Sequence, residues 1–215
     1  MIGFGFGMAG MEEKLEQITS ELAKEHESVT YIEIGVAEGA TLTAIAHTLK
    51  KSGKPWRAIG IELPNGYSFD MQRTIDNSIS RQVKLDFILP NGNIQRPQWE
   101  TVTVYFRDSQ TFLGELWQDD IQLALIDGCH GRPCVKLDFL MLEAWMKPRA
   151  MVMFHDYSEE QYGHHQPHCP SGIDVRGAVA DLGLANGKRA GWKFIETIPA
   201  DRSKGGWDMA VFRKE

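Results

Sequence analysis

A short β-rich run that enters two glycines and then a helical segment constrains the fold of this chain most. Residues 29–34 have the β-branched and aromatic content of a strand, Gly35 and Gly39 follow, and good helix formers occupy residues 41–51. Glycine allows a sharp turn and lets backbone N–H groups approach a ligand where a helix begins. The glycine pair alone is more often an ordinary turn between a strand and a helix. The residues that follow along the chain decide whether this is a ligand-binding turn or an ordinary one.

Further strand-like runs follow, and polar residues stand at the ends of the next four. These runs are residues 57–62 with Glu62, 101–106 with Asp108 and Ser109, 121–126 with Asp127, and 150–154 with His155 and Asp156. Helical patterns cover 133–146 and 174–182, and later strand candidates cover 192–198 and 207–212. The alternation predicts a Rossmann-like, doubly wound α/β fold: a mostly parallel seven-stranded sheet with helices on both faces and a C-terminal antiparallel hairpin strand. Such sheets bind ligands at the carboxyl ends of their strands.

Length and composition suit one domain. The chain has 215 residues, 42% of them hydrophobic, which is enough for a single core without disulfide support. We expect residues 1–28 to form an N-terminal tail and an amphipathic helix, and residues 29–215 to form the ligand-binding domain. Residues 64–100 are long for one connection, and we interpret them as an insertion, with a helix near 70–80, that helps to shape a site. The sequence leaves the oligomeric state open, a homo-oligomer included.

Charge and targeting signals argue against several kinds of partner. The net charge is −6 and the basic residues are scattered, so we expect neither a nucleic-acid nor a membrane partner. The apolar runs are strand-sized, and residues 1–10 lack the pattern of a signal peptide, which favours a cytoplasmic protein. Cys129, Cys134 and Cys169 have no paired spacing and suit reduced thiols.

The strand-end residues, taken in order, resemble the successive motifs of class I S-adenosylmethionine (SAM)-dependent methyltransferases. The motifs are the acid-x-Gly-x-x-x-Gly run that starts at Glu33, the strand-end Glu62 and the Asp108-Ser109 pair. The resemblance implies these cofactor contacts: Glu33 near the methionine amino group, Gly35 and Gly39 along the cofactor, Thr41 at the helix start, Glu62 on the ribose, Asp108 and Ser109 at the adenine, and Asp127 nearby. The turn lacks the middle glycine of G-x-G-x-x-G, which disfavours a nicotinamide cofactor.

The ends of the fourth and fifth predicted strands resemble one subgroup of these enzymes. Asp127-Gly-Cys-His130 and His155-Asp156 are similar to the strand ends of cephalosporin-hydroxylase-like and macrolide-sugar O-methyltransferases, some of which bind a divalent metal. Carboxylates on adjacent strand ends can share one hard cation such as Mg²⁺ or Mn²⁺. The predicted metal ligands are Asp127, His155 and Asp156. His155 stands where these relatives often have a carboxylate, and imidazole suits Mn²⁺ better than Mg²⁺.

His130 and Asp127 are the predicted catalytic residues. An imidazole that titrates near neutrality can remove the proton of a hydroxyl group as a methyl group arrives. The sequence therefore indicates a SAM-dependent methyltransferase that acts on a small hydroxylated molecule. A non-catalytic SAM-binding module and, less favoured, a nicotinamide-dependent oxidoreductase remain as alternatives. The histidine-rich residues 162–169 are interpreted as a substrate lid rather than a zinc site.

Overall fold

The protein is described by a computed structural model that covers residues 10–64, 69–90, 96–117, 119–158, 172–201, 203 and 207–215. Its strands are β1 (Val29–Ile34), β2 (Trp56–Glu62), β3 (Lys84–Ile88), β4 (Thr101–Phe106), β5 (Ile121–Ile126), β6 (Met146–Phe154), β7 (Trp192–Ile198) and β8 (Met209–Lys214). Its helices are α1 (Glu12–Glu25), α2 (Ala40–Lys51), α3 (Met71–Arg81), α4 (Ser109–Thr111), the π-helical η1 (Phe112–Leu116), α5 (Arg132–Glu143) and α6 (Val175–Asp181).

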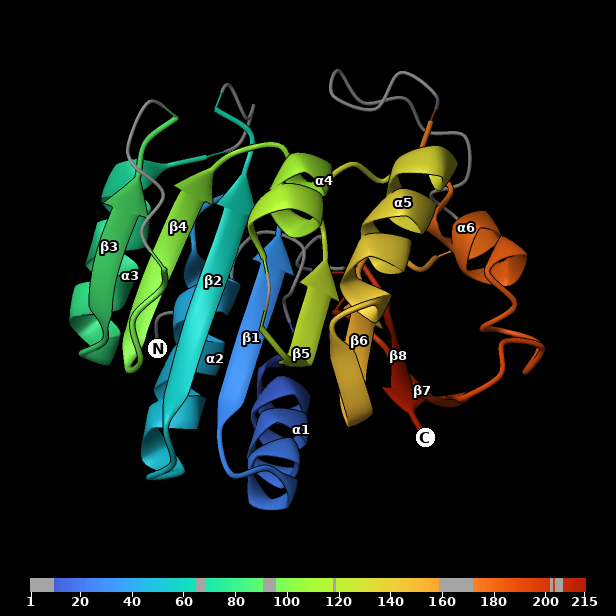
Figure 1. The fold of residues 1–215 in the computed structure, drawn as a ribbon, viewed down its shortest axis with the longest axis horizontal. Coiled ribbons are helices and arrows are strands. Elements are labelled where there is room, and N and C mark those ends of the chain that lie inside the picture. The colour runs from blue at the N-terminus through green and yellow to red at the C-terminus, as the bar shows by residue number, and fades with distance from the viewer. Residues whose placement is uncertain are drawn as a thin grey trace.

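All eight strands form one mixed sheet in the order β3-β4-β2-β1-β5-β6-β8-β7 (Figure 1). Strands β1 to β6 pair in parallel, β8 pairs antiparallel with β6, and β7 pairs antiparallel with β8. The Rossmann-like fold with a C-terminal antiparallel hairpin is thus confirmed. The sheet has one strand more than the seven predicted, because Lys84–Ile88 adds β3 beside β4 at the edge.

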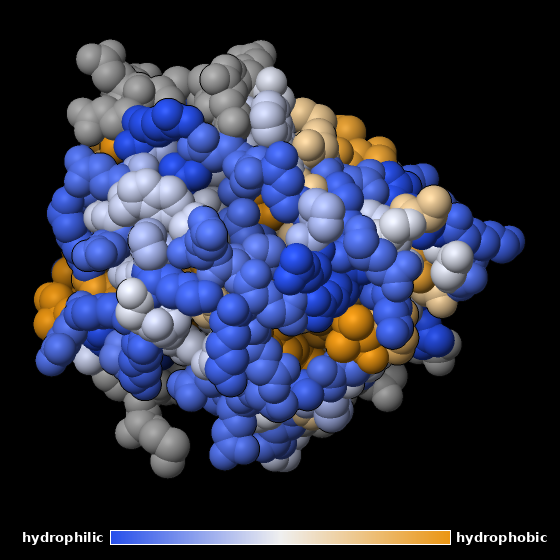
Figure 2. Space-filling view, turned by 60° about the horizontal axis from the view of Figure 1, so that its bottom comes forward, coloured by the Kyte–Doolittle hydropathy of each residue, from blue (hydrophilic) through white to orange (hydrophobic). Residues whose placement is uncertain are grey.

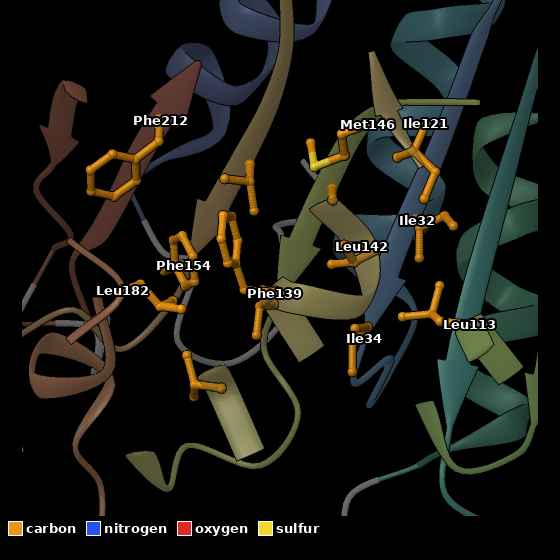
Figure 3. Packing of buried hydrophobic residues seen from close by; sticks show 14 of the residues in the cluster. Ile32, Ile34, Leu113, Ile121, Phe139, Leu142, Met146, Phe154, Leu182 and Phe212 are labelled. Atoms are coloured by element: carbon orange, nitrogen blue, oxygen red, sulfur yellow. The ribbon is translucent and has the colours of Figure 1, made fainter. Parts of the chain in front are cut away.

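Helices cover both faces of the sheet, and each face has its own apolar core. On one face α1 and α2 pack against the sheet through side chains such as Leu15, Leu22 and Leu42. On the other face η1, α5 and α6 cover β1, β5 and β6. Figure 1 shows α4, α5 and α6 in front of the sheet and α2 and α3 behind it. Figure 3 shows the packing under α5, where Phe139 lies against Phe154 of β6 with ring centroids 5.8 Å apart.

The helix predicted near residues 70–80 is present as α3. Asp70 caps it, because its carboxylate accepts a hydrogen bond from the backbone N–H of Arg73 at 3.0 Å. The described part of the predicted insertion therefore supplies both α3 and the edge strand β3.

Figure 2 brings forward the end of the molecule where the parallel strands begin. Polar side chains cover most of this face, and apolar ones form separate patches. Among the described residues, no helix combines the length and the apolar character needed to cross a bilayer. The polar strand-end residues lie at the opposite end, along the upper edge of the sheet in Figure 1.

Candidate active site

The turn after β1 has glycine at two positions where the backbone is left-handed and a side chain would meet close neighbours. Gly35 has φ +86°, and a Cβ atom there would lie 2.4 Å from the carbonyl oxygen of Asp127. Gly39, which starts α2, has φ +64°, and a Cβ atom there would lie 2.5 Å from Cγ2 of Thr74. L-residues with a side chain rarely adopt this region, and neither position has room for one. The glycines therefore let the turn pack directly against the end of β5 and against α3.

Helix α3 also fixes the turn by hydrogen bonds. The N–H of Asp70 donates to the carbonyl of Ala37 at 3.0 Å, and the side-chain amide of Asn77 donates to the carbonyl of Glu38 at 2.9 Å. The turn itself has left-handed geometry at Ala37, with φ +47°. A segment interpreted from sequence as an insertion is thus in direct contact with the candidate cofactor turn.

Glu62, at the end of β2, is buried beneath the same turn. Its Oε2 accepts hydrogen bonds from the N–H groups of Val36 at 2.9 Å and Ala37 at 3.2 Å, and its Oε1 accepts one from Leu63 at 3.0 Å. A carboxylate offers about four acceptor positions, so Oε1 retains one for a further donor. The sequence did not predict that Glu62 would hold the turn in place.

Glu33 is buried in β1, one strand away from Glu62. The hydroxyl of Tyr31 donates to its Oε2 at 2.5 Å. Burial raises the pKa of Glu33 well above its usual value, the hydrogen bond from Tyr31 opposes this effect, and the charges of Asp127 and Glu62 add to it. Burial therefore disfavours the ionised form of Glu33, and a cation that approached it would favour that form.

The predicted adenine-contacting pair follows β4. The carboxylate of Asp108 caps α4 by accepting a hydrogen bond from the N–H of Thr111 at 3.0 Å. The hydroxyl of Ser109 donates to Oδ1 of Asp138 in α5 at 2.6 Å. Thr41 lies buried in the first turn of α2.

Asp138 is a residue that the sequence interpretation missed. It is only 2% exposed, on the face of α5 that also buries Val135, Phe139 and Leu142. Burial raises the pKa of Asp138 to about 7. The hydrogen bond from Ser109 lowers this pKa, and the charge of Asp108 raises it. The signal was present, since an acid occupied a position where the helical period of this segment requires an apolar residue.

Two aspartates and two histidines converge at the ends of β5 and β6. Nε2 of His130 lies 3.2 Å from Oδ1 of Asp127, and its Nδ1 lies 3.1 Å from Oδ2 of Asp156. Nδ1 of His155 lies 2.8 Å from Oδ1 of Asp127 and 3.2 Å from Oδ1 of Asp156. The structure thus brings together all the residues predicted as catalytic or metal-binding, and we call these four the strand-end cluster.

The charges in the strand-end cluster reinforce one another. Burial alone would raise the pKa of Asp127, but the charge of His155 and the hydrogen bonds from His130 and His155 hold it well below its usual range. Burial lowers the pKa of His130, but the hydrogen bond to Asp127 and the charge of Asp156 outweigh it, so the pKa of His130 is raised. The cluster therefore favours the ionised form of Asp127 and the protonated form of His130.

Within the described residues, the group of potential metal ligands is Asp127, His130 and Asp156, with ligand atoms within 4.8 Å of one another. The oxygens and the imidazole nitrogen of this group fit a divalent cation such as Mn²⁺. His155, predicted as the third ligand, borders both carboxylates but is not a member of the group. Asp156 has φ +58°, a left-handed conformation that aspartate tolerates better than most residues. This turn after β6 keeps Asp156 buried beside His155.

A pocket of about 270 Å³ lies at the start of α6, and none of its lining residues belongs to the strand-end cluster. Its walls include Arg132, Ser158, Ile173 and Arg176, and most of its exposed lining is apolar. Two of these residues follow cluster members by two positions, and the N–H of Asp174 in the wall donates to the carbonyl of His130 at 3.0 Å. The pocket is therefore within reach of the cluster.

The histidine-rich residues 162–169, predicted to form a lid, lie outside the described part of the chain. Cys169 lies there too. The described cysteines, Cys129 and Cys134, form no disulfide.

Comparison with known proteins agrees with this geometry. A family model described as a methyltransferase domain matches residues 32–157, which is more than half of the chain and includes the glycine turn and the strand-end cluster. No curated protein sequence matches the chain significantly.

The fold is similar to those of solved O-methyltransferases. One from Bacillus cereus, in complex with SAH, superposes with a TM-score of 0.62 at 13% identity over 95% of this chain and 80% of that chain. TomG from Streptomyces achromogenes, involved in tomaymycin synthesis and solved in complex with SAM, superposes with a TM-score of 0.60 at 15% identity over 94% and 79%. At such identities the likeness shows the fold, and the match over residues 32–157 shows the family: this chain belongs to the methyltransferase-domain family.

Proposed function

We propose that this methyltransferase transfers the methyl group of SAM to a hydroxyl group of a small molecule. The observation that carries the proposal is the convergence of Asp127, His130 and Asp156 beside the glycine turn of β1. An acceptor hydroxyl needs a base, and a base is placed next to the turn where this fold binds ligands. Two solved O-methyltransferases with this fold, one in complex with SAH and one in complex with SAM, support both the donor and the kind of acceptor.

In this proposal the donor lies across the carboxyl ends of β1, β2 and β4. The residues that hold it are Glu33, Gly35, Gly39, Thr41, Glu62, Asp108, Ser109 and Asp127. Glu33 binds the amino group of the methionine part, because the approach of an ammonium group favours the ionised form of this buried carboxyl. Glu62 binds a ribose hydroxyl through the free acceptor position of Oε1.

Truncation of Glu62 tests the donor site. We expect Glu62→Ala to weaken SAM binding by about 2–4 kcal/mol, because charge-assisted hydrogen bonds to the ribose and to the turn are lost together. Glu62→Gln should lose less affinity for SAM, because its amide oxygen can still accept hydrogen bonds from the N–H groups of Val36 and Ala37. Titration calorimetry of both variants measures the difference. Unchanged affinity in a folded Glu62→Ala protein would remove Glu62 from the site.

In the transfer step, His130 acts as the general base. As the acceptor oxygen forms its bond to the methyl carbon and the bond from that carbon to sulfur breaks, His130 takes the proton of the hydroxyl. Asp127 keeps the imidazole in place and stabilises its protonated form, since Oδ1 lies 3.2 Å from Nε2. In the proposal, the body of the acceptor lies in the pocket whose walls include Arg132, Ser158, Ile173 and Arg176.

A divalent metal is part of the proposal. Asp127, Asp156 and His155 would hold it while His130 serves as the base. If His130 of the observed grouping held the ion instead, His155 would take the proton. When bound, such an ion lowers the pKa of an acceptor hydroxyl. The protein's own contribution is to hold the two carboxylates close together and to favour the ionised form of Asp127, whose pKa is lowered.

Removal of metal tests this part separately. We expect exhaustive chelation to reduce turnover by about tenfold or more, and added Mn²⁺ or Mg²⁺ to restore it, because the ion supplies several kcal/mol of charge stabilisation. Asp156→Asn should abolish the restoration, whereas Asp76→Asn, at an exposed position of α3, should not change it. Turnover that is indifferent to chelation would exclude a metal and leave the base-catalysed transfer standing.

Formation of S-adenosylhomocysteine (SAH) from SAM with a panel of hydroxylated small molecules tests the function as a whole. Turnover with at least one acceptor supports the proposal. Tight SAM binding without turnover on any acceptor would favour the non-catalytic binding module.

A further inference from the structure

A buried acid in α5 contacts the loop that is proposed to meet the adenine ring. Asp138 shares its helix face with Val135, Phe139 and Leu142, and an apolar side chain there would avoid the cost of burying a carboxyl group. Natural chains that retain such a cost often do so at functional sites. The partner of Asp138 is Ser109, which follows β4, so the contact connects α5 to the segment after β4.

The contact with Ser109 determines what the hydroxyl of Ser109 can do. A serine hydroxyl has one hydrogen and two lone pairs. The hydrogen is directed to Oδ1 of Asp138 at 2.6 Å, and an ionised carboxylate can only accept. The oxygen of Ser109 is thereby left as an acceptor for any other ligand. The acid next to Ser109 in the chain, Asp108, caps α4 by accepting a hydrogen bond from the N–H of Thr111.

We propose that Asp138 makes Ser109 an acceptor-only group and thereby sets the preference of the cofactor site for a purine that carries an amino group. Adenine presents an exocyclic N–H donor at its six position, whereas hypoxanthine presents a carbonyl oxygen there. An oxygen placed against an acceptor-only Ser109 would lose the hydrogen bond and meet another lone pair. Asp138 itself does not touch the ligand, so it is a positioning residue. The inference rests on the proposed function, because it assumes that the loop after β4 meets the adenine of SAM.

The experiment compares the affinities for SAH and for S-inosylhomocysteine, its deaminated analogue, by calorimetry at pH 8. At this pH the carboxyl group of Asp138, whose pKa is about 7, is mostly ionised. We expect the wild-type protein to prefer SAH by about tenfold or more, as loss of one hydrogen bond together with an opposed lone pair implies. Ser109→Ala and Asp138→Leu should each reduce the preference to about twofold or less. The preference of the double variant for SAH should be no smaller than that of either single variant, because both changes remove the same interaction.

Leu142→Ala is the matched control for simple loss of helix stability. Leu142 is fully buried one turn further along α5, so its truncation lowers the melting temperature without touching the loop. The ratio of the two affinities should then stay at the wild-type value. Ser109→Ala, at a half-buried site, provides a second route if Asp138→Leu does not fold.

The outcomes separate the two proposals. A wild-type protein that binds neither SAH nor its analogue contradicts the proposed function. A wild-type protein that binds both equally, or an Asp138→Leu variant that keeps the full preference, overturns the role of Asp138 and leaves the proposed function intact.

Discussion

Replacing His130 by glutamine is expected to lower methyl transfer by about 10²- to 10⁴-fold, the usual contribution of a positioned general base. The affinity for SAM should change far less than the rate, because glutamine can still donate a hydrogen bond to Asp127, the donor-site residue that the ring contacts at 3.2 Å. Single-turnover measurements on an identified acceptor, at saturating SAM, separate the chemical step from binding and release.

His47→Gln is the matched control. His47 is also partly buried, and its Nδ1 lies 2.9 Å from the carbonyl oxygen of Arg81, on the helical layer away from the strand-end cluster. Its loss should affect the melting temperature more than the rate. Near-normal single-turnover rates for His130→Gln would exclude His130 as the base and move the role to His155, the other imidazole of the cluster.

Gly35→Ala is expected to lower the free energy of unfolding by about 3 kcal/mol or more. Two costs combine at this position: the left-handed conformation, worth about 1–2 kcal/mol for a residue with a side chain, and the overlap of the new Cβ with the backbone of Asp127 and Gly128. Urea unfolding of the variant and the parent protein measures the change.

Gly53→Ala isolates the first of these costs. Gly53 has φ +70°, and a Cβ atom there meets nothing within 4 Å. It should therefore lose only about 1–2 kcal/mol, the cost of the left-handed conformation alone. If both variants lost the same free energy of unfolding, the overlap at Gly35 would cost nothing, and the turn would move away from the end of β5 without penalty.

The sequence predicted the central strands β1, β2, β4 and β5 well, because each is rich in β-branched, aromatic and other apolar residues and is buried along its whole length. Strand β3 was missed for the opposite reason. Residues 84–88 read Lys-Leu-Asp-Phe-Ile, the strand has a neighbour on one side only, and none of its residues is fully buried. An edge strand needs no continuous apolar run, so its sequence is hard to tell from a polar connection.

The cluster at the ends of β5 and β6 was predictable as a set, because parallel strands end at the same edge. Its internal arrangement was not. That both imidazoles contact both carboxylates depends on the left-handed backbone of Asp156 and on the close packing of the β1 turn against β5, neither of which the spacing of residues reveals. The partnership of Ser109 and Asp138 was hidden for a similar reason, since it joins positions 29 residues apart in different elements.

The contact of Gly35 with the backbone of Asp127 means that the proposed donor site and the proposed acceptor site share a wall. A ligand that displaces the turn also displaces Asp127, so the two binding equilibria are linked. Linkage is reciprocal: a donor that changes the affinity for the acceptor by some factor must have its own affinity changed by the same factor. A single coupling free energy, carried by the contact at Gly35, then describes how much the binding of donor or acceptor changes the affinity for the other.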